Sequence, residues 1–207
     1  MARNAVLLPG RDRAALALVV EAERIAEHLD PGRVTVLEIG FGRAEFILSQ
    51  AAERPAPLFV GIEVSRKRVA KAAKRAARRD LSNLRLVASP AEFAVERVLP
   101  DACIDECWIN FPDPWPKKRH FKRRLIQPSF AKQMARVLRR GAPLYVATDH
   151  RGYASWIAEQ LAAIPELENE AAPAHWFSEP PARITTAYEA EWQSLGRDIA
   201  YFRYRRS

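Results

Sequence analysis

The sequence predicts an α/β protein with a mostly parallel sheet covered by helices on both faces. Short apolar segments typical of buried strands alternate with amphipathic segments typical of helices, which is the order of β-α-β units. The chain has 207 residues, a length that favours a single domain over residues 1–207. Its hydrophobic fraction of 48% is ordinary for a globular protein, and a chain of this length buries about 70% of its unfolded surface.

The individual elements follow from periodicity and from turn residues. Strands are expected over residues 34–39, 58–62, 84–88, 104–109 and 143–148, with a late antiparallel strand over 199–204. Helices are expected over residues 44–53, 65–79, 91–98, 128–138 and 153–164. The Ala-rich segment 11–29 also has a helical period and stops at Asp30-Pro31-Gly32, so we expect an N-terminal helix there.

Positive charge is concentrated in two runs. The formal net charge is +8, and the segment Ser65–Arg79 carries eight cations without an acidic residue. The segment Lys117–Arg124 carries six cations among eight residues. Either run alone is consistent with a solvated face, but two runs near one candidate site favour a polyanionic partner such as nucleic acid.

Other features narrow the class of protein. Cys103 and Cys107 lie in an apolar run and are expected to be core thiols in a reducing compartment. The four histidines show no metal-ligand spacing, so no metal site is expected. No apolar run approaches the roughly 18 residues of a membrane span, and the N-terminus lacks the pattern of a signal peptide. We therefore expect a cytoplasmic protein that does not bind a membrane.

The first two strand ends carry acidic residues beside glycines. Glu38 precedes Gly40 and Gly42, which let the backbone turn tightly and approach a ligand. A dinucleotide site would hold a pyrophosphate here, but Glu45 would repel it. The pattern instead suits S-adenosylmethionine, although an ordinary strand-to-helix turn would look similar. Glu63 follows the second strand and either accepts the ribose hydroxyls of a nucleoside or caps the next helix.

The third strand end is the least favourable for a nucleoside. Many such sites place an Asp there for the adenine amino group, whereas this chain has Pro90, which offers only a carbonyl. The backbone at Ala91 or the side chain of Glu92 is an alternative acceptor. A plain helix cap at Ser89 explains the same stretch equally well.

The fourth strand runs into the segment WINFPDPWPKKRHFKRR, residues 108–124. Its three prolines restrict the loop and so hold the carboxylate of Asp113 at little entropic cost. Trp115 either stacks on a base or belongs to the core. The following cations are of the kind that contact phosphates. Asp149, after the fifth strand, adds a polar group at the same edge of the sheet.

Taken together, these segments resemble the bacterial tRNA guanine-N7 methyltransferases, which modify the guanine at position 46 of the tRNA variable loop. The matching segments occur in the family's order and spacing from about residue 33 onwards. They are EIGFG (38–42), GIEV (61–64), SNLRLV (82–87), NFPDPWPKKRHFKRRLIQ (110–127), ATD (147–149) and TAYE (186–189). The segment FPDPW with its basic run is highly specific, whereas the glycine motif is generic to methyltransferases.

The resemblance implies a Rossmann-like class I methyltransferase fold that uses S-adenosylmethionine and acts on tRNA. It implies a catalytic role for Asp113. The cofactor would be bound by Glu38, Gly40, Gly42, Glu63 and Pro90, and the substrate by Lys117, Asp149, Thr186 and Glu189. No obligatory protein partner is evident, and the protein is expected to be a monomer or a homodimer.

Two positions depart from the family pattern, and two other functions stay open. Pro90 replaces an Asp that helps to hold the adenine side of the cofactor, and Ala44 replaces a third glycine. The first departure is the best support for an alternative, an RNA-binding protein of this fold that has lost efficient cofactor binding. The other alternative is an amino-methyltransferase acting on adenine or protein, because Asn110-Phe111-Pro112 distantly resembles the N-P-P-[YFW] loop of those enzymes.

Overall fold

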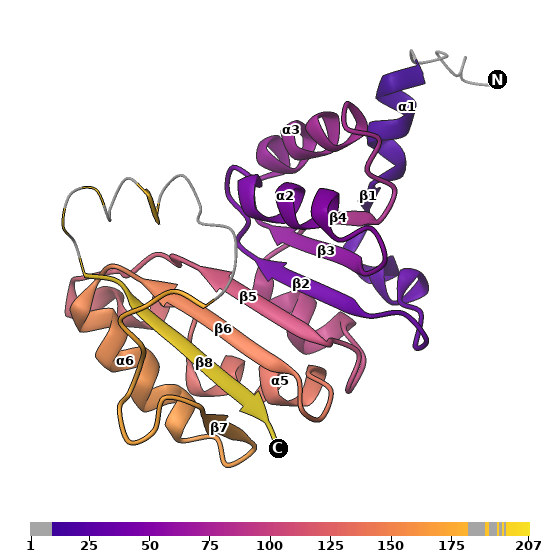
Figure 1. Ribbon diagram of the computed structural model, residues 1–207. Helices are drawn as coiled ribbons and strands as arrows, with labels where there is room; N and C mark the ends of the chain where they lie inside the picture. Colours follow the sequence, from indigo (N-terminus) through magenta and orange to yellow (C-terminus); the bar gives the residue numbers. More distant parts are fainter. Residues whose placement is uncertain (1–9, 182–188, 191–193, 195, 197) are drawn as a thin grey trace.

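Figure 1 shows the computed structural model of the chain, which describes residues 10–181, 189–190, 194, 196 and 198–207. Within these residues one eight-stranded sheet has the order β1-β4-β3-β2-β5-β6-β8-β7. Its strands are β1 (Val19–Val20), β2 (Thr35–Ile39), β3 (Leu58–Glu63), β4 (Leu84–Ala88), β5 (Glu106–Asn110), β6 (Pro143–Thr148), β7 (Leu167–Asn169) and β8 (Ala200–Arg206). The first six strands pair in parallel, and β8 is antiparallel to β6 and β7. The predicted late antiparallel strand is confirmed.

The strand order reverses at β2. From β2 the chain proceeds outward through β3 to β4, and it then returns to place β5 and β6 on the other side of β2. In doubly wound sheets, ligands bind beyond the carboxyl ends of the strands at such a reversal. The ends of β2 and β5 therefore mark the position at which a site is expected.

Helices cover both faces of the sheet, as predicted. On one face lie α1 (Gly10–Ala17), α2 (Glu45–Glu53) and α3 (Arg66–Ala77), and on the other lie α5 (Pro128–Val137) and α6 (Arg151–Ala162) (Figure 1). Shorter turns are η1 (Ala22–His28), α4 (Ala91–Phe93), η2 (Ala94–Val98) and η3 (Lys118–Arg123). The small side chains of Ala72, Ala73 and Ala76 let α3 approach the sheet closely, and all three are buried.

The expected continuous helix over residues 11–29 is wrong. Helix α1 ends at Ala17, and Val19 and Val20 form β1, which pairs in parallel with Leu86 and Val87 of β4. The chain then turns into the 3-10 helix η1. Consecutive β-branched residues fit a strand well, and the edge of β4 supplies partners for their backbone groups. Pairing with a distant segment thus outweighs the local helical period.

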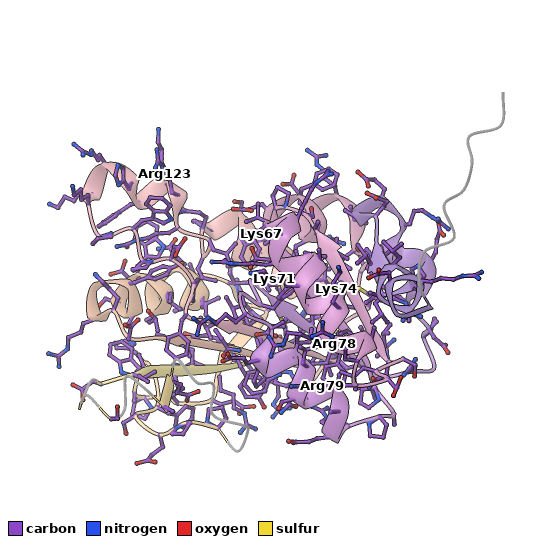
Figure 2. The ribbon with its side chains drawn as sticks, turned by 90° about the horizontal axis from the view of Figure 1, so that it is seen from above. Lys67, Lys71, Lys74, Arg78, Arg79 and Arg123 are labelled. Carbon is purple, nitrogen blue, oxygen red and sulfur yellow. The ribbon has the colours of Figure 1, made fainter. Side chains whose placement is uncertain are left out.

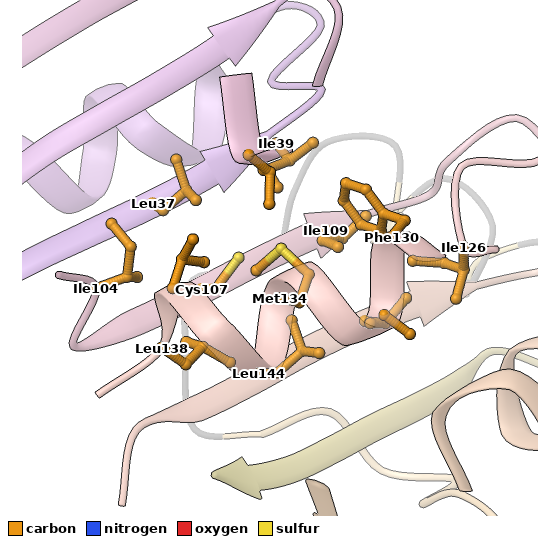
Figure 3. Packing of buried hydrophobic residues seen from close by; sticks show 14 of the residues in the cluster. Leu37, Ile39, Ile104, Cys107, Ile109, Ile126, Phe130, Met134, Leu138 and Leu144 are labelled. Atoms are coloured by element: carbon orange, nitrogen blue, oxygen red, sulfur yellow. The ribbon is translucent and has the colours of Figure 1, made fainter. Parts of the chain in front are cut away.

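The face covered by α5 and α6 holds the larger apolar core. Figure 3 shows side chains of β2 and β5 packing on α5, with Met134 beside Cys107. Both cysteines are buried free thiols, as predicted, and burial raises the pKa of Cys103 to about 11. Burial also raises the pKa of Cys107 well above its ordinary value. Within the described part of the chain, no helix combines the length and the apolar character needed to cross a membrane.

Candidate active site

A cavity of about 960 Å³ lies at the carboxyl ends of β2, β3, β4, β5 and β6. Most of the site residues predicted from the sequence share its wall. These are Glu38, Gly40, Gly42, Glu63, Pro90, Asp113 and Asp149. The volume is at the upper end of the range of small-molecule sites, so the cavity has room for a nucleoside and for part of a second ligand.

The glycine-containing turn after β2 forms one side of the cavity. Gly40 and Gly42 have φ of 72° and 52°, in the left-handed region that favours glycine. A Cβ at Gly61 of β3 would lie 2.8 Å from the Phe41 ring, so the absence of a side chain there lets the turn pack on the sheet. Ala44 also has a left-handed φ of 59° and is fully buried. The alanine at this departure from the family pattern therefore adopts a conformation that suits glycine better.

Glu63 is fixed at the cavity wall by backbone donors. Its two carboxylate oxygens accept hydrogen bonds from the backbone N–H groups of Gly42 (3.1 Å) and Ser65 (2.9 Å). The guanidinium of Arg68 lies 3.5 Å from the same carboxylate, and the Glu63 side chain is 4% exposed. Each carboxylate oxygen has two acceptor sites, so both retain the capacity to accept from a ligand. The carboxylate also helps to join the turn to the start of α3.

Glu38 is the second buried carboxylate of the site, with an exposed fraction of 4%. The amide Nδ2 of Asn110, at the end of β5, donates to its Oε1 at 3.3 Å. This bond connects the two strands that flank the reversal of strand order. Asn110 also lines the cavity. The sequence marked it only as part of the segment 110–127 and of the loop that resembles N-P-P-[YFW], without assigning it a role at the site.

The end of β4 differs from the helix cap considered for Ser89. The N-cap of α4 is Pro90, without a side-chain hydrogen bond, and the Ser89 hydroxyl donates to the Pro90 carbonyl at 3.0 Å. The cap interpretation of Ser89 is therefore wrong. Glu92 and Val64 line the cavity together with Pro90, and Val64 is 69% exposed. This part of the wall offers an apolar surface and a carboxylate.

The proline loop after β5 carries Asp113 on an exposed position of the cavity wall. Phe111 and Trp115, on either side of Asp113, have φ of 53° and 41°, so two non-glycine residues adopt the left-handed conformation. Such residues cost about 1–3 kcal/mol each and persist where their surroundings fix them. Trp115 is half-buried, lines the cavity, and has the Arg123 guanidinium 4.9 Å from its ring centroid. The interpretation of Trp115 as a core residue is therefore wrong. Stacking of Trp115 on a base stays a prediction.

Arg124, the last cation of the second basic run, is buried and bonded to the proline loop. Its side chain is 3% exposed, and its Nε donates to the carbonyl of Pro114 at 2.9 Å. The guanidinium lies 3.6 Å from the ring centroid of Phe121. It lies farther from the ring centroids of Tyr153 (5.0 Å) and Trp156 (5.1 Å). The expectation that all six cations contact phosphates is therefore wrong for this residue. The other five are exposed: Lys117, Lys118, Arg119, Lys122 and Arg123.

The remaining substrate residues predicted from the sequence are placed differently. Asp149 lies between the main cavity and a second cavity of about 590 Å³, and it lines both. Lys117 is exposed at the start of η3, outside the lining of either cavity. Glu189 is fully buried, and its Oε1 accepts from the Tyr201 hydroxyl at 2.7 Å. Thr186 lies outside the described residues.

The wall thus combines two buried carboxylates, Glu38 and Glu63, and the exposed carboxylate of Asp113 with a cationic rim. Glu38, Glu63 and Asp113 come from the ends of three different strands, and Arg68 and Arg123 lie at the rim. Carboxylates at these positions suit a ligand with ammonium, sulfonium or hydroxyl groups, and they disfavour a pyrophosphate. Among the described residues, no cluster of His, Cys, Asp or Glu could hold a metal ion.

Comparison with known proteins assigns this architecture to a family. Residues 32–202 match the family model described as "Putative methyltransferase". Among solved structures, the aminoglycoside resistance methyltransferase NpmB1 superimposes with a TM-score of 0.63 at 16% identity, over 90% of this chain and 93% of its own. The 16S rRNA methyltransferase KamB gives 0.62 at 20% identity, over 89% and 92%. These likenesses confirm the Rossmann-like class I methyltransferase fold.

Sequence relatives are closer. The tRNA (guanine-N(7)-)-methyltransferase of Magnetococcus marinus is 40% identical over 171 residues, covering 83% of this chain and 68% of the relative. The protein of the same name from Acidithiobacillus ferrooxidans is 39% identical over 214 residues, covering 99% and 94%. The match thus extends over almost the whole of both chains. This chain belongs to the tRNA (guanine-N(7)-)-methyltransferase family.

Proposed function

We propose that this protein transfers a methyl group from S-adenosylmethionine to N7 of a guanine in tRNA. The observation that carries the proposal is the shared cavity, at which Glu38, Glu63 and Asp113 meet from three strand ends. The names of the relatives, 39–40% identical over most of the chain, support the same reaction. The guanine at position 46 of the variable loop is the target that the family resemblance implies.

The cavity wall fits the methyl donor. When bound, S-adenosylmethionine supplies an electrophilic methyl group on a sulfonium. Glu63 would accept from ribose hydroxyls, and Glu38 would face the cationic end of the ligand, with Gly40 and Gly42 allowing close backbone approach. The exposed side chain of Val64 offers apolar surface to a purine. Glu92 lines the same wall as Pro90 and can supply the side-chain carboxylate that Pro90 lacks.

Asp113 would bind the acceptor base. The carboxylate can accept hydrogen bonds from N1–H and the exocyclic amino group of guanine, on the edge opposite N7. Guanine N7 has a lone pair in the ring plane, so no base needs to remove a proton before the methyl group is transferred. N7 methylation leaves the purine cationic, and a fixed carboxylate stabilises this developing charge. Catalysis then consists mainly of positioning and electrostatics.

The exposed cations of residues 117–123 would bind the phosphate backbone of the tRNA. Lys117 and Arg123 stand on the segment that directly follows Asp113, so backbone contacts there would orient the base above the carboxylate. Asp149, Thr186 and Glu189 are proposed substrate residues by family resemblance. A cytoplasmic monomer or homodimer without an obligatory protein partner completes the proposal.

The test uses the purified chain, unmodified tRNA and S-adenosylmethionine, followed by mass analysis of nucleosides and of mapped fragments. We expect 7-methylguanosine at one position of the variable loop, and no product from a transcript in which that guanine is replaced by adenine. A methylated adenine, or no methylated nucleoside at all, would contradict the proposal. If no methylated nucleoside forms, calorimetry with S-adenosylhomocysteine shows whether the cofactor site works. A pure RNA-binding module would give no heat of cofactor binding.

A further inference from the structure

The outward face of α3 carries an aligned row of cations. At 3.6 residues per turn, Lys67, Lys71, Lys74 and Arg78 fall on one side of the helix, opposite the buried Val69, Ala72, Ala73 and Ala76. Figure 2 shows Lys67, Lys71, Lys74, Arg78 and Arg79 following one another along α3, with Arg123 beyond the Lys67 end. The row from Lys67 to Arg78 is about 16 Å long at 1.5 Å per residue. We call these four aligned side chains the α3 row.

Most of the α3 row makes no ion pair with the part of the chain that the structure describes. Other cations of the helix are bonded within the chain: Arg68 pairs with Glu63, and Arg75 donates to the carbonyl of Arg43 in the glycine turn. Lys74 has Asp12 at 3.6 Å, and both side chains are largely exposed. For Lys67, Lys71 and Arg78, the described residues provide no acidic partner.

The spacing of these cations opposes helix stability. Like charges three or four residues apart destabilise a helix, and Lys71 has cations at all four such positions: Lys67, Arg68, Lys74 and Arg75. A face selected only for solubility would mix acidic and basic residues at these spacings. The α3 row therefore has the charge pattern of a surface that is completed by an anionic partner.

The position of the helix connects the row with the cavity. Arg68, in the first turn of α3, lines the cavity, and so does Arg123 of the basic segment after Asp113. A polyanion with one nucleotide in the cavity and its neighbouring phosphates on residues 117–123 would continue past the start of α3. We propose that the α3 row is a second contact surface for tRNA, binding phosphates outside the methylated nucleotide and its immediate neighbours. This inference rests on the proposed function.

Lys71→Glu tests whether the α3 row binds phosphates or is only a solvated face. The two explanations predict different combinations of effects on stability and on tRNA binding. With four cationic neighbours, this change removes repulsion and should raise Tm under either explanation. If the row binds phosphates, it should also weaken tRNA binding by about tenfold and lower the slope of log Kd against log salt by about one or more. A merely solvated face would show the stabilisation alone.

The matched control is Lys132→Glu. Lys132 is exposed on α5, on the opposite face of the sheet, so the change in charge is the same. Its one cationic neighbour at helical spacing is Arg136, so the gain in stability should be smaller than for Lys71→Glu. We expect the tRNA affinity and salt slope of this variant to stay close to wild type. Affinity for S-adenosylhomocysteine, measured by calorimetry, should be unchanged in both variants because neither residue lines the cavity.

The outcomes separate the two proposals. If wild type makes 7-methylguanosine but Lys71→Glu binds tRNA as tightly as Lys132→Glu, the α3 row is not a tRNA surface and the proposed function stands. If wild type makes no 7-methylguanosine but Lys71→Glu still weakens tRNA binding selectively, the binding surface stands and the reaction is wrong. Failure of wild type to bind tRNA overturns both.

Discussion

The two basic runs look alike in the sequence, but the structure uses them differently. In the segment 65–79, which contains α3, the helical period leaves Lys67, Lys71 and Arg78 facing outward without an acidic partner among the described residues. In the segment 117–124 there is no long helix, and the last cation, Arg124, lies buried under the proline loop. The first run therefore provides mainly surface charge, with Arg68 and Arg75 bonded to the cavity wall. The second provides surface charge together with a buried support for the loop of Asp113.

The comparison shows that charge density alone does not reveal how a cation is used. Like-charge spacing in α3 costs about 0.2–0.5 kcal/mol for each pair, an amount a stable domain tolerates in return for a binding surface. Burial of Arg124 instead requires compensation, which the Pro114 carbonyl and the faces of Phe121, Tyr153 and Trp156 supply. Variants of the two regions should therefore separate chemistry, stability and binding.

The largest effect is expected from Asp113→Ala, which tests whether the loop performs chemistry while α3 only binds. Loss of the carboxylate should lower the single-turnover rate of methyl transfer by about 10²–10³-fold, in the range found when one preorganised stabilising group is removed. Affinity for tRNA should change by less than about threefold, because the cations remain. Single-turnover kinetics and filter binding measure the two quantities. Equal losses in rate and affinity would show that Asp113 contributes to binding alone.

Arg124→Lys should produce the next largest effect. A lysine keeps the charge but loses the planar group that stacks on the rings and the Nε donor to Pro114, so the free energy of unfolding should fall by about 2–4 kcal/mol. Denaturant unfolding measures this loss. The neighbouring exposed residue gives the control, and Arg123→Lys should leave stability within about 0.5 kcal/mol. If both variants are equally stable, Arg124 does not support the loop.

Lys117→Ala should have a smaller effect, confined to tRNA binding. The side chain is exposed and outside the cavity lining, so neither stability nor S-adenosylhomocysteine affinity should change. If Lys117 contacts a phosphate, the slope of log Kd against log salt should fall by about one, and affinity should weaken several-fold at constant salt. An unchanged slope would mean that this lysine is only a solvated side chain, unlike the contact proposed for Lys71.

The sequence predicted the parallel sheet and its helices because the strands that lie between covered faces are nearly continuous apolar runs. It also indicated Glu38, Glu63 and Asp113, because functional groups in this class of fold follow strand ends. Features that depend on distant partners escaped it. Strand β1 forms only because the edge of β4 is available, and the burial of Arg124 requires Tyr153 and Trp156 from α6 to lie beside the loop. Neither the pairing of β1 with β4 nor the packing of Arg124 against α6 can be recognised from the residues next to it in the sequence.

The smallest expected effect is that of Ser65→Ala, which asks whether α3 depends on local capping in the way the loop depends on Arg124. Ser65 is the N-cap of α3, and its hydroxyl accepts from the Arg68 backbone N–H at 3.4 Å, a long bond. The backbone N–H of Ser65 also holds Glu63 and persists in alanine. The loss of stability should therefore lie near the lower limit for N-caps, about 0.5 kcal/mol. Cofactor and tRNA affinities should follow wild type, because Glu63 and the α3 row keep their positions. A loss of 2 kcal/mol or more, measured by denaturant unfolding beside Arg124→Lys, would show that the start of α3 is as dependent on one side chain as the proline loop is.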